Sequence, residues 1–361
     1  RWPWPRNKLA RLVEQLFDHY GVALVAFDIV FAEPDDSSGL AVLEELAADQ
    51  LSGVPDFASH LQVIRPSLDY DGIFAETIQK YDVVLGYYFS VGVDANSAQR
   101  TGSLPDPLFS KSTFQGKNVR FLDAVGFGGN LDSLMASALG AGHFTQEPDR
   151  DGVVREVPML IRYKDNFYGS LSLEIVRQVL GAEEIIPRFE QPLFNARGYP
   201  GLEWLMVGNT GVPVGNRIKT LVPFRGGRGS FPYVPATQVL HGVADKAVLK
   251  NKIVLVGTSA PGLLDLRTTP MEEAYPGVEV HANRDAGILN GKMLQAPEYT
   301  LGAEVLMLVV IGLGMILAGT ILSPLNTTLF TAIGICLYIA FNHLIWVSGG
   351  VVLPLASGIL M

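Results

Sequence analysis

The C-terminal part of the chain is almost free of charged residues, and this feature constrains the fold most strongly. No Lys or Arg follows Lys292, and Glu304 is the only acidic residue beyond Thr300. Uncharged apolar runs occupy residues 305–322 and 329–346, and another begins at 351 and reaches 361. As a helix, such a run measures about 27 Å, close to the ~30 Å hydrocarbon core of a bilayer. The sequence therefore predicts transmembrane helices within residues 301–361, after an extramembrane domain that spans residues 1–300.

The charge and cysteine content exclude some classes of function. The chain carries 27 basic and 36 acidic residues, a net charge of −9, whereas a nucleic-acid-binding domain needs a basic face. We therefore expect no nucleic-acid partner. The single cysteine, Cys336, lies in an apolar run, so no intrachain disulfide can form. A domain of this size buries enough apolar surface to fold without one, and the cysteine count permits either an exported or a cytoplasmic domain.

The first part of the chain alternates between strand-like and helix-like patterns. Residues 22–31 and 83–89 are apolar, β-branched and aromatic runs that indicate buried strands. Helical periodicity appears before, between and after them, at residues 7–20, 40–49, 70–81 and 170–180. Two strands joined by helices form a parallel βαβ unit. We therefore predict an α/β fold with a mixed, largely parallel sheet flanked by helices, followed by an all-α transmembrane region.

Four other segments have less regular patterns. Residues 95–118 are polar and aperiodic, which favours a surface loop. Between 140 and 163, two apolar runs flank a turn-forming stretch at 148–152, which predicts a β-hairpin. Residues 188–216 are rich in loop-forming residues, and residues 218–224 are expected to form a strand.

A short strand, a Gly-rich turn and a helix follow one another between Lys252 and Gly291. The apolar run 253–256 ends at Gly257, and a helical pattern starts at Val278. In open α/β sheets, ligands bind outside the carboxyl ends of the strands, where this turn and the end of the first strand would lie. The candidate ligand-binding residues are therefore Asp28, Gly257, Thr258, Ser259, Asp265 and His281.

The two carboxylates among these candidates, Asp28 and Asp265, also have a structural interpretation. A half-buried Asp commonly caps backbone N–H groups or pairs with an Arg, and Arg267 and Arg6 are the nearest candidates for that pairing. Pairing with Arg would indicate a contact that holds the N-terminal segment to the core. An open pocket above the carboxylates would instead indicate sensing, and the sequence leaves both interpretations open.

Neither a catalytic nor a metal site is indicated. Ser259, Asp265 and His281 follow the order of a hydrolase triad, but a nucleophile elbow needs G-x-S-x-G and a proline replaces the second glycine. Asp149 and Asp151 lack the spacing of an EF-hand, and His281 has no second His or Cys at metal-ligand spacing. We therefore predict no catalytic residue, metal or cofactor in this chain.

Two other polar features have local interpretations. The Gly-rich segment 225–229 contains two arginines and could bind an anion through its backbone N–H groups, although no Walker pattern accompanies it. Asn342 and His343 lie near the end of the second apolar run, where polar residues either serve a signal relay or are solvated at the membrane surface.

Short motifs are spread over nearly the whole chain. WPWPR occupies residues 2–6, FDIVFAEP occupies 27–34, and the pattern D-x-D-G-V-x-R at 149–155 is followed by Ser170-Leu171. The later motifs are Gly257-Thr258, Gly262-Leu263, Asp265, Thr269-Pro270, Pro276-Gly277-Val278 and His281-Ala282-Asn283. Together they resemble the type-two CHASE family, the cyclase/histidine-kinase-associated sensory extracellular domains.

The resemblance implies a multi-pass protein of the bacterial inner membrane, with residues 1–300 outside the cytoplasm. In the family, a strand and a transmembrane helix normally precede WPWPR, and we expect both upstream of this chain. A cytoplasmic effector follows the last helix, most often a class III adenylate or guanylate cyclase and otherwise a kinase. The full-length protein is therefore expected to be a signal-transduction receptor, although its effector lies outside this sequence.

The resemblance also implies partners. Class III cyclases form their active sites between two protomers, so we expect a homodimer, an unknown extracellular ligand and contact with membrane lipid. Gly314 and Ala318 have the small-xxx-small spacing that lets helices approach closely, between protomers or within one. Two alternative classes remain open: a membrane-anchored periplasmic hydrolase, and a subunit whose external domain only docks partners.

Overall fold

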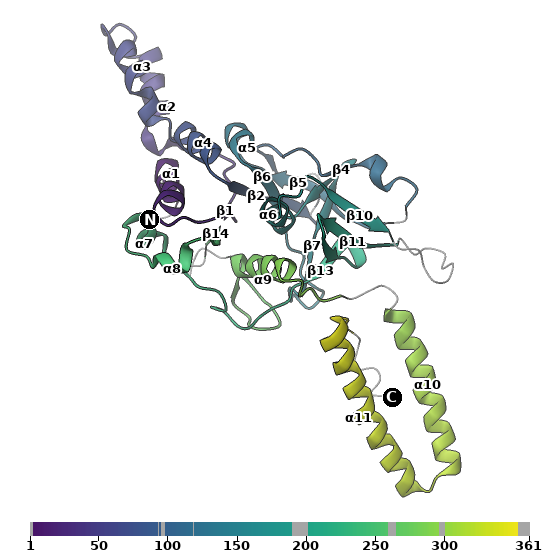
Figure 1. Cartoon of the computed structure of the whole chain (residues 1–361). Coiled ribbons are helices and arrows are strands. Elements are labelled where there is room, and N and C mark those ends of the chain that lie inside the picture. The colour runs from purple at the N-terminus through teal and green to yellow at the C-terminus, as the bar shows by residue number, and fades with distance from the viewer. Residues whose placement is uncertain are drawn as a thin grey trace.

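A nine-stranded sheet forms the centre of the protein, in the order β14-β1-β2-β5-β8-β9-β4, with β6 also paired to β2 and β3 to β5 (Figure 1). The computed structural model describes residues 3–92, 94, 98–117, 119–189, 201–258, 265–295 and 300–352. Parallel pairing prevails, and helices cover the sheet. The predicted fold class, a mixed and largely parallel sheet flanked by helices, is therefore confirmed.

The parallel half of the sheet contains the deepest part of the core. Its strands are β14 (Ile253–Val256), β1 (Leu24–Phe27), β2 (Val83–Val91) and β6 (Gly140–His143). All four residues of β1 are buried, because β1 lies between β14 and β2 and both of its faces are covered. The predicted parallel βαβ unit is therefore present, with β1 and β2 as its strands.

Alternate residues of β1 face different helices. Val25 and Phe27 pack in one cluster with α1 (Arg6–Glu14), α4 (Tyr70–Lys80) and α5 (Asp132–Ser137). Leu24 and Ala26 pack in another cluster with α6 (Leu171–Val179), which in turn contacts α9 (Gly277–Leu289). The sheet thus has α1, α4 and α5 on one face and α6 and α9 on the other.

The first helix is longer than α1 alone. A π-helical turn, η1 (Gln15–His19), continues it, so the helix predicted for residues 7–20 is present. Pro5 occupies the N-cap position of α1, and no side chain caps the helix.

The predicted hairpin between residues 140 and 163 is wrong. The turn itself forms, because the Gly152 N–H donates to the Asp149 carbonyl oxygen at 2.9 Å. The strands on its two sides, however, have different partners: β6 pairs with β2, whereas β8 (Leu160–Tyr163) pairs with β5 (Leu122–Gly128) and β9 (Asn166–Gly169). A Cβ at Gly142 would lie 2.5 Å from the Cα of Leu171, so β6 lies directly beneath α6 and pairs inside the sheet.

The segment expected to be loop-rich, 188–216, contains strands. β11 (Leu202–Val207) and β12 (Thr210–Pro213) form a small antiparallel sheet with β10 (Ile185–Phe189). Leu205, Val207 and Val212 are fully buried in this sheet, and that burial stabilises strands whose sequences are too short to show clear alternation. Residues 190–200 of the expected loop lie outside the described residues.

The remaining elements are short or peripheral. Within the expected loop 95–118, the described residues 98–117 are mostly irregular and contain the small strands β3 (Arg100–Thr101) and β4 (Phe109–Ser110). The strand expected at 218–224 is shorter, β13 (Lys219–Leu221), and pairs with β7 (Glu156–Pro158). The others are α2 (Leu40–Ala48), α3 (Phe57–Leu68), α7 (Ala236–Leu240), α8 (Lys246–Leu249), β15 (Leu266–Arg267) and β16 (Tyr275–Pro276).

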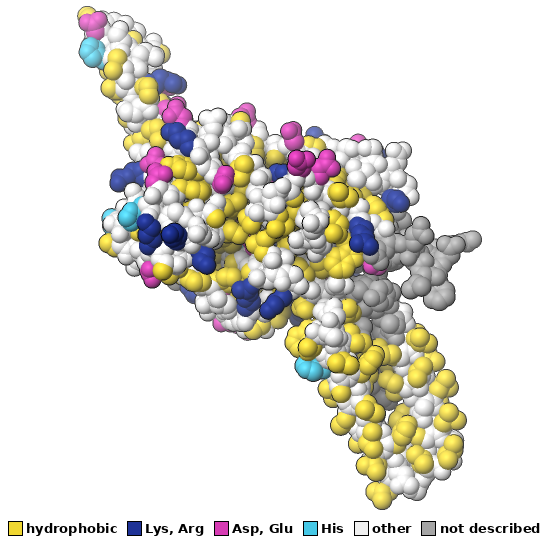
Figure 2. Space-filling view, in the orientation of Figure 1, with side chains coloured by type: hydrophobic (Ala, Val, Ile, Leu, Met, Phe, Trp, Pro, Cys, Tyr) yellow, Lys and Arg dark blue, Asp and Glu magenta, His cyan; other side chains and the backbone are white. Residues whose placement is uncertain are grey.

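Two apolar helices extend from the body, α10 (Thr300–Ile321) and α11 (Pro324–Gly349) (Figure 1). α11 is long and apolar enough to cross a bilayer, whereas the apolar part of α10, Val305–Ile321, is shorter. None of the residues of α11 is buried, and Figure 2 shows apolar side chains over both helices. Helices that are apolar on all sides are stable in lipid or against a partner, not in water. Most of the predicted third run, 353–361, lies outside the described residues.

Candidate functional site

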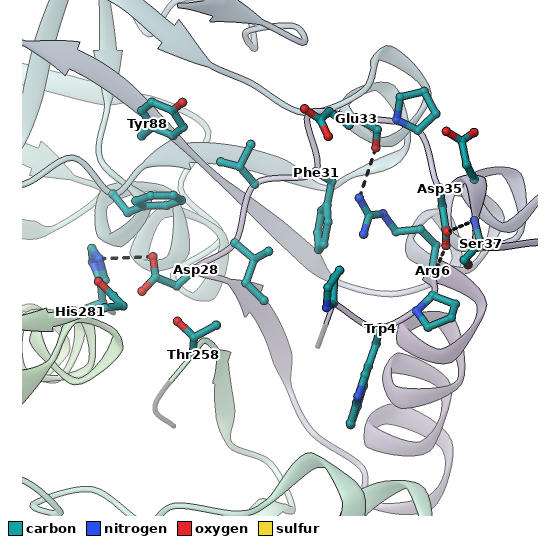
Figure 3. A pocket seen from close by; sticks show the side chains of 18 of the residues that line it. Trp4, Arg6, Asp28, Phe31, Glu33, Asp35, Ser37, Tyr88, Thr258 and His281 are labelled. Atoms are coloured by element: carbon teal, nitrogen blue, oxygen red, sulfur yellow. Dashed lines mark hydrogen bonds and ion pairs between the residues drawn. The ribbon is translucent and has the colours of Figure 1, made fainter. Parts of the chain in front are cut away.

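The carboxyl ends of β1 and β14 meet at a pocket of about 640 Å³. Asp28 directly follows β1, and its backbone N–H donates to the carbonyl oxygen of Val256, the last residue of β14, at 2.8 Å. Thr258 and Asp265 come after β14, and His281 comes from α9. All four polar residues line the pocket, and Figure 3 shows Asp28, Thr258 and His281 there. The parallel pairing of β1 with β14 therefore brings these candidates together.

Two glycines allow α9 to approach the ends of the strands. A Cβ at Gly257 would lie 2.8 Å from the Cβ of Val278, and a Cβ at Gly277 would overlap the carboxylate of Asp265. The Gly277 N–H donates to the backbone oxygen of Asp265 at 2.9 Å. The candidate Gly257 therefore serves close packing between β14 and the first turn of α9, which brings His281 to the pocket.

The proton on His281 can be assigned from its neighbours. Its Nδ1 lies 2.7 Å from Nη2 of Arg284, and a guanidinium can only donate, so Nδ1 accepts and the ring proton is on Nε2. That Nε2 lies 3.8 Å from Oδ1 of Asp28. Burial, followed by the charge of Arg284, lowers the pKa of His281 well below its ordinary value. His281 is therefore neutral and directs an N–H toward Asp28.

Asp28 is buried at the base of the pocket, with a side chain that is 5% exposed. Burial and, next, the charge of Asp265 raise its pKa from 3.8 to about 7, against the opposing effect of Arg267. Asp265 itself forms an ion pair with Arg267 at 3.0 Å, and burial raises its pKa. The two carboxylates thus interact, but only Asp265 has an Arg partner among the residues that the structure describes.

Arg6, the other Arg considered as a partner, is engaged at the far end of the pocket. Its Nε lies 3.5 Å from Asp71, its Nη2 donates to the backbone oxygen of Glu33 at 3.3 Å, and its guanidinium lies 4.6 Å from the ring centroid of Phe31. Arg6 therefore holds the N-terminal segment to the loop after β1 (Figure 3), without contacting Asp28 or Asp265.

Sequence reasoning missed the aromatic side of the pocket. Trp4, Phe31, Tyr88 and Phe144 line it, together with Gln146. Tyr88 and Phe144 come from β2 and from the residue after β6, with ring centroids 6.4 Å apart. Their position depends on the parallel pairing of β2 with β6, and the sequence around residue 140 did not indicate that pairing.

A buried polar cluster beneath the pocket was also missed. Nε of Arg284 donates to Oγ of Ser172 on α6 at 2.7 Å, and Arg284 is 1% exposed. Asp285 and His143 are buried beside it, and burial raises the pKa of Asp285 to about 6 and lowers that of His143 to about 3. The available signal was the run of polar residues HANRD, 281–285, inside a helix between two apolar elements.

The backbone N–H groups of the Gly-rich segment 225–229 do bind an anionic group, but this group is a side-chain carboxylate of the same chain. The carboxylate of Glu279 accepts the backbone N–H of Gly229 at 3.1 Å and the hydroxyl of Tyr233 at 2.6 Å. Oδ1 of Asn283 accepts the N–H of Arg225 at 2.9 Å. The segment therefore fixes the outer side of α9.

Other candidates can be placed briefly. Asp149 and Asp151 both pair with Arg155 at 2.8 Å, in agreement with a structural turn. Ser259 lies outside the described residues. Within the described ranges, no three His, Cys, Asp or Glu side chains are arranged to hold a metal ion.

The comparisons with known proteins agree with the motifs. The sequence matches the family described as CHASE2 domain over residues 1–319, which includes the pocket, α9 and most of α10. No curated protein and no solved structure matches the chain. β1, which leads into FDIVFAEP, and β14, which leads into Gly257-Thr258, end side by side at the pocket. α9, which contains His281-Ala282-Asn283, borders the same pocket. The chain therefore belongs to the CHASE2 family, whose members are extracellular sensory domains of signalling receptors.

Proposed function

We propose that this chain is the sensory and transmembrane part of a bacterial receptor, in which the pocket receives the stimulus and α9 relays it to the membrane helices. One observation carries the proposal: α9 borders the pocket and is also the last helix before α10. His281 of α9 faces Asp28, α9 ends at Leu289, and α10 begins at Thr300. A ligand that displaces His281 therefore acts on the helix nearest the membrane.

The proposed location is the bacterial inner membrane, with residues 1–300 outside the cytoplasm. The end of α11 returns to the start of α10, because the Gln295 N–H donates to the Gly350 oxygen at 2.8 Å and the Val352 N–H donates to the Gln295 oxygen at 2.9 Å. A chain that crosses twice and returns to the outer surface needs a third span to reach the cytoplasm. The apolar run 351–361, about half the length of a span, would form part of it.

In this proposal the effector is a class III nucleotide cyclase, with a kinase as the alternative, and the receptor is a homodimer. α10 packs against α11, and Ala318 is 7% exposed. Ala318 therefore packs within one protomer, whereas a Cβ at Gly314 would meet nothing within 4 Å, so the Gly314 side of α10 offers space for a second protomer.

A fusion of the whole chain to a class III cyclase catalytic domain, placed after Met361, tests the relay. Gly257→Ala would place a Cβ 2.8 Å from Val278 and push α9 away from β14, whereas a Cβ at Gly53 meets nothing within 4 Å. We expect Gly257→Ala to change cyclic AMP in a cyclase-deficient bacterial strain and Gly53→Ala to leave it unchanged. Equal cyclic AMP from both variants, at equal amounts of membrane-inserted protein, would contradict the relay.

A further inference from the structure

The base of the pocket contains a buried carboxylate, Asp28, with few neighbouring groups that offset its negative charge. The side chain of Asp28 is 5% exposed, and among the described residues its one polar contact is with Nε2 of His281, at 3.8 Å. That distance is longer than a hydrogen bond. His281 is neutral because its Nδ1 accepts a hydrogen bond from Arg284, so it supplies no positive charge. A buried carboxylate without a cation or hydrogen-bond donor is costly.

The other charges of the pocket leave this carboxylate unpaired. Both cationic side chains that line the pocket are engaged, Arg267 with Asp265 at 3.0 Å and Arg6 with Asp71 at 3.5 Å. The lining carboxylates outnumber the two guanidinium groups: they are Asp28, Glu33, Asp35, Asp36 and Asp265. Oε1 of Gln146, another hydrogen-bond acceptor, is buried and has no partner in the part of the chain that the structure describes. Nε of Arg267 and Nε of Arg6 are also buried without a hydrogen-bond partner in that part of the chain, but the carboxylates outnumber the guanidinium groups, so the lining carries a net negative charge.

The walls of the pocket are aromatic. Tyr88 lines the pocket on the side of Asp28, whereas Phe31 lies beside Arg6 and Trp4 lines that other end (Figure 3). Phe144 also lines the pocket, with its ring centroid 6.4 Å from that of Tyr88. Aromatic faces attract cations that carry little water, so carboxylates and rings together favour an organic ammonium group. A metal ion would instead need several oxygen or nitrogen ligands, and no group of three acidic, His or Cys side chains within the described ranges is arranged for this.

We propose that the pocket binds a small organic ammonium compound, with its charged nitrogen on Asp28 and its apolar part against Tyr88 and Phe144. The inference rests on the proposed sensory role of the pocket and adds the chemical class of the ligand. The ammonium N–H groups would donate to the Asp28 carboxylate and to Oε1 of Gln146, which is buried without a partner in the described part of the chain.

Binding should be linked to release of a proton. The pKa of Asp28 is about 7 in the free protein, so the carboxyl group is largely protonated below that pH and ionised above it. The charged groups that act on it are Asp265, Arg267, Arg284 and Asp285, with neutral His281 beside them. A bound ammonium stabilises the ionised form, so affinity should rise about tenfold between about pH 6 and about pH 8.

The test uses the full chain in detergent and isothermal titration calorimetry with 2-phenylethylammonium chloride, which combines an ammonium group with an aromatic ring. The neutral analogue 2-phenylethanol controls for apolar binding. Asp28→Asn removes the buried charge at constant shape, and Glu45→Gln removes one exposed charge of α2, outside the pocket. At about pH 8 we expect binding of the ammonium probe, at least about tenfold (~1.4 kcal/mol) weaker binding by Asp28→Asn, and wild-type binding by Glu45→Gln.

A second variant keeps the test informative if Asp28→Asn does not fold. Tyr88→Leu removes one half-buried ring and should weaken the binding of 2-phenylethylammonium several-fold. The ligand class is wrong if the wild type does not bind the ammonium probe, if 2-phenylethanol binds equally well, or if Glu45→Gln loses as much affinity as Asp28→Asn. The relay is tested separately by Gly257→Ala in the cyclase fusion, which needs no ligand, so the two failures are distinguishable.

Discussion

Asp28 combines deep burial with an incomplete set of partners, and this combination has a measurable effect on stability. Its pKa rises from 3.8 to about 7 on folding, mainly through burial. The folded state therefore binds the Asp28 proton more tightly than the unfolded state does. The contribution of the Asp28 carboxyl group to the free energy of unfolding is fully present below about pH 4 and is lost as the pH rises toward 7.

We expect Asp28→Asn to increase the free energy of unfolding at about pH 8, because the amide needs no proton to stay neutral in a buried site. A rise from 3.8 to about 7 corresponds to a free energy on the order of 4 kcal/mol, since one pKa unit is about 1.4 kcal/mol. Near pH 4 the variant and the wild type should be equally stable. Urea unfolding of the two proteins at both pH values measures the difference, and a variant that is less stable at about pH 8 would assign Asp28 a structural role.

Gly257, unlike Asp28, contributes to stability because it has no side chain, which lets β14 and α9 pack closely. A Cβ there would lie 2.8 Å from both Cβ and Cγ2 of Val278 and 3.5 Å from Cβ of Asp28. Because β14 and α9 are both packed in the core, neither moves freely.

Gly257→Ala should therefore lower the free energy of unfolding by about 1–3 kcal/mol, the usual cost of overpacking. Gly53→Ala is the matched control, because its Cβ would meet nothing within 4 Å. Thermal unfolding of the two variants gives the comparison. Similar melting temperatures for both variants would show that α9 shifts without loss of stability, and would contradict the steric argument.

At the level of elements, the helical hairpin of α2 and α3 is only weakly attached to the body. It projects at the end remote from α10 and α11 (Figure 1). α2 has no buried residue, and in α3 only Leu61 is buried. Val42, Val63 and Ile64 are exposed at 59%, 79% and 46%. Such segments open locally at low cost in free energy.

We expect protease to cut first in the turn between these helices, residues 49–56, while the sheet stays intact. Replacing residues 40–68 with a short Gly-Ser linker should leave the melting temperature of the body almost unchanged, because few core contacts are lost. A large decrease in melting temperature would show that the hairpin supports the core. The extent of cleavage and the melting temperature are measured on the same sample.

The elements also show what the sequence could predict. The limits of β14, 253–256, and the start of α9 beside Val278 were predicted almost to the residue, because an apolar run and a helical pattern are separated there by Gly and Pro. The pairing of β6 was not predicted. Its sequence GAGH, 140–143, has almost no apolar surface, and its place in the sheet depends on the space left beneath α6.

The residues of the pocket likewise divide into those that local sequence patterns predict and those that only the pairing of distant strands brings together. Asp28, Thr258, Asp265 and His281 were found because each follows or faces the end of a predicted strand. The aromatic wall could not be found, since Tyr88 and Phe144 meet only through the pairing of β2 with β6. Contacts between segments far apart in the chain are set by tertiary structure, which local patterns do not report.

At the scale of the whole molecule, a water-exposed body is joined near Gln295 to a pair of apolar helices whose one charged residue is Glu304. Every residue of α11 is at least partly exposed. We expect a chain that ends at Gln295 to be soluble, and the full chain to stay with the membrane through a carbonate wash and to need detergent. Fractionation of both proteins from the same cells measures this, and full-length protein in the wash would contradict the membrane assignment.

The position of β1 also determines when the protein can complete its fold. β1 is paired on one side with β2, which ends at Val91, and on the other with β14, which begins at Ile253. A chain that is exported from its N-terminus delivers β1 long before β14, so one edge of β1 has unpaired backbone groups during that interval. Such edges pair readily with other chains, and sheets with distant partners close slowly. Export of this domain therefore requires that residues 24–27 stay protected from pairing with other chains until about two thirds of the chain has crossed the membrane. Export chaperones would provide that protection, although β1 is fully paired in the folded protein.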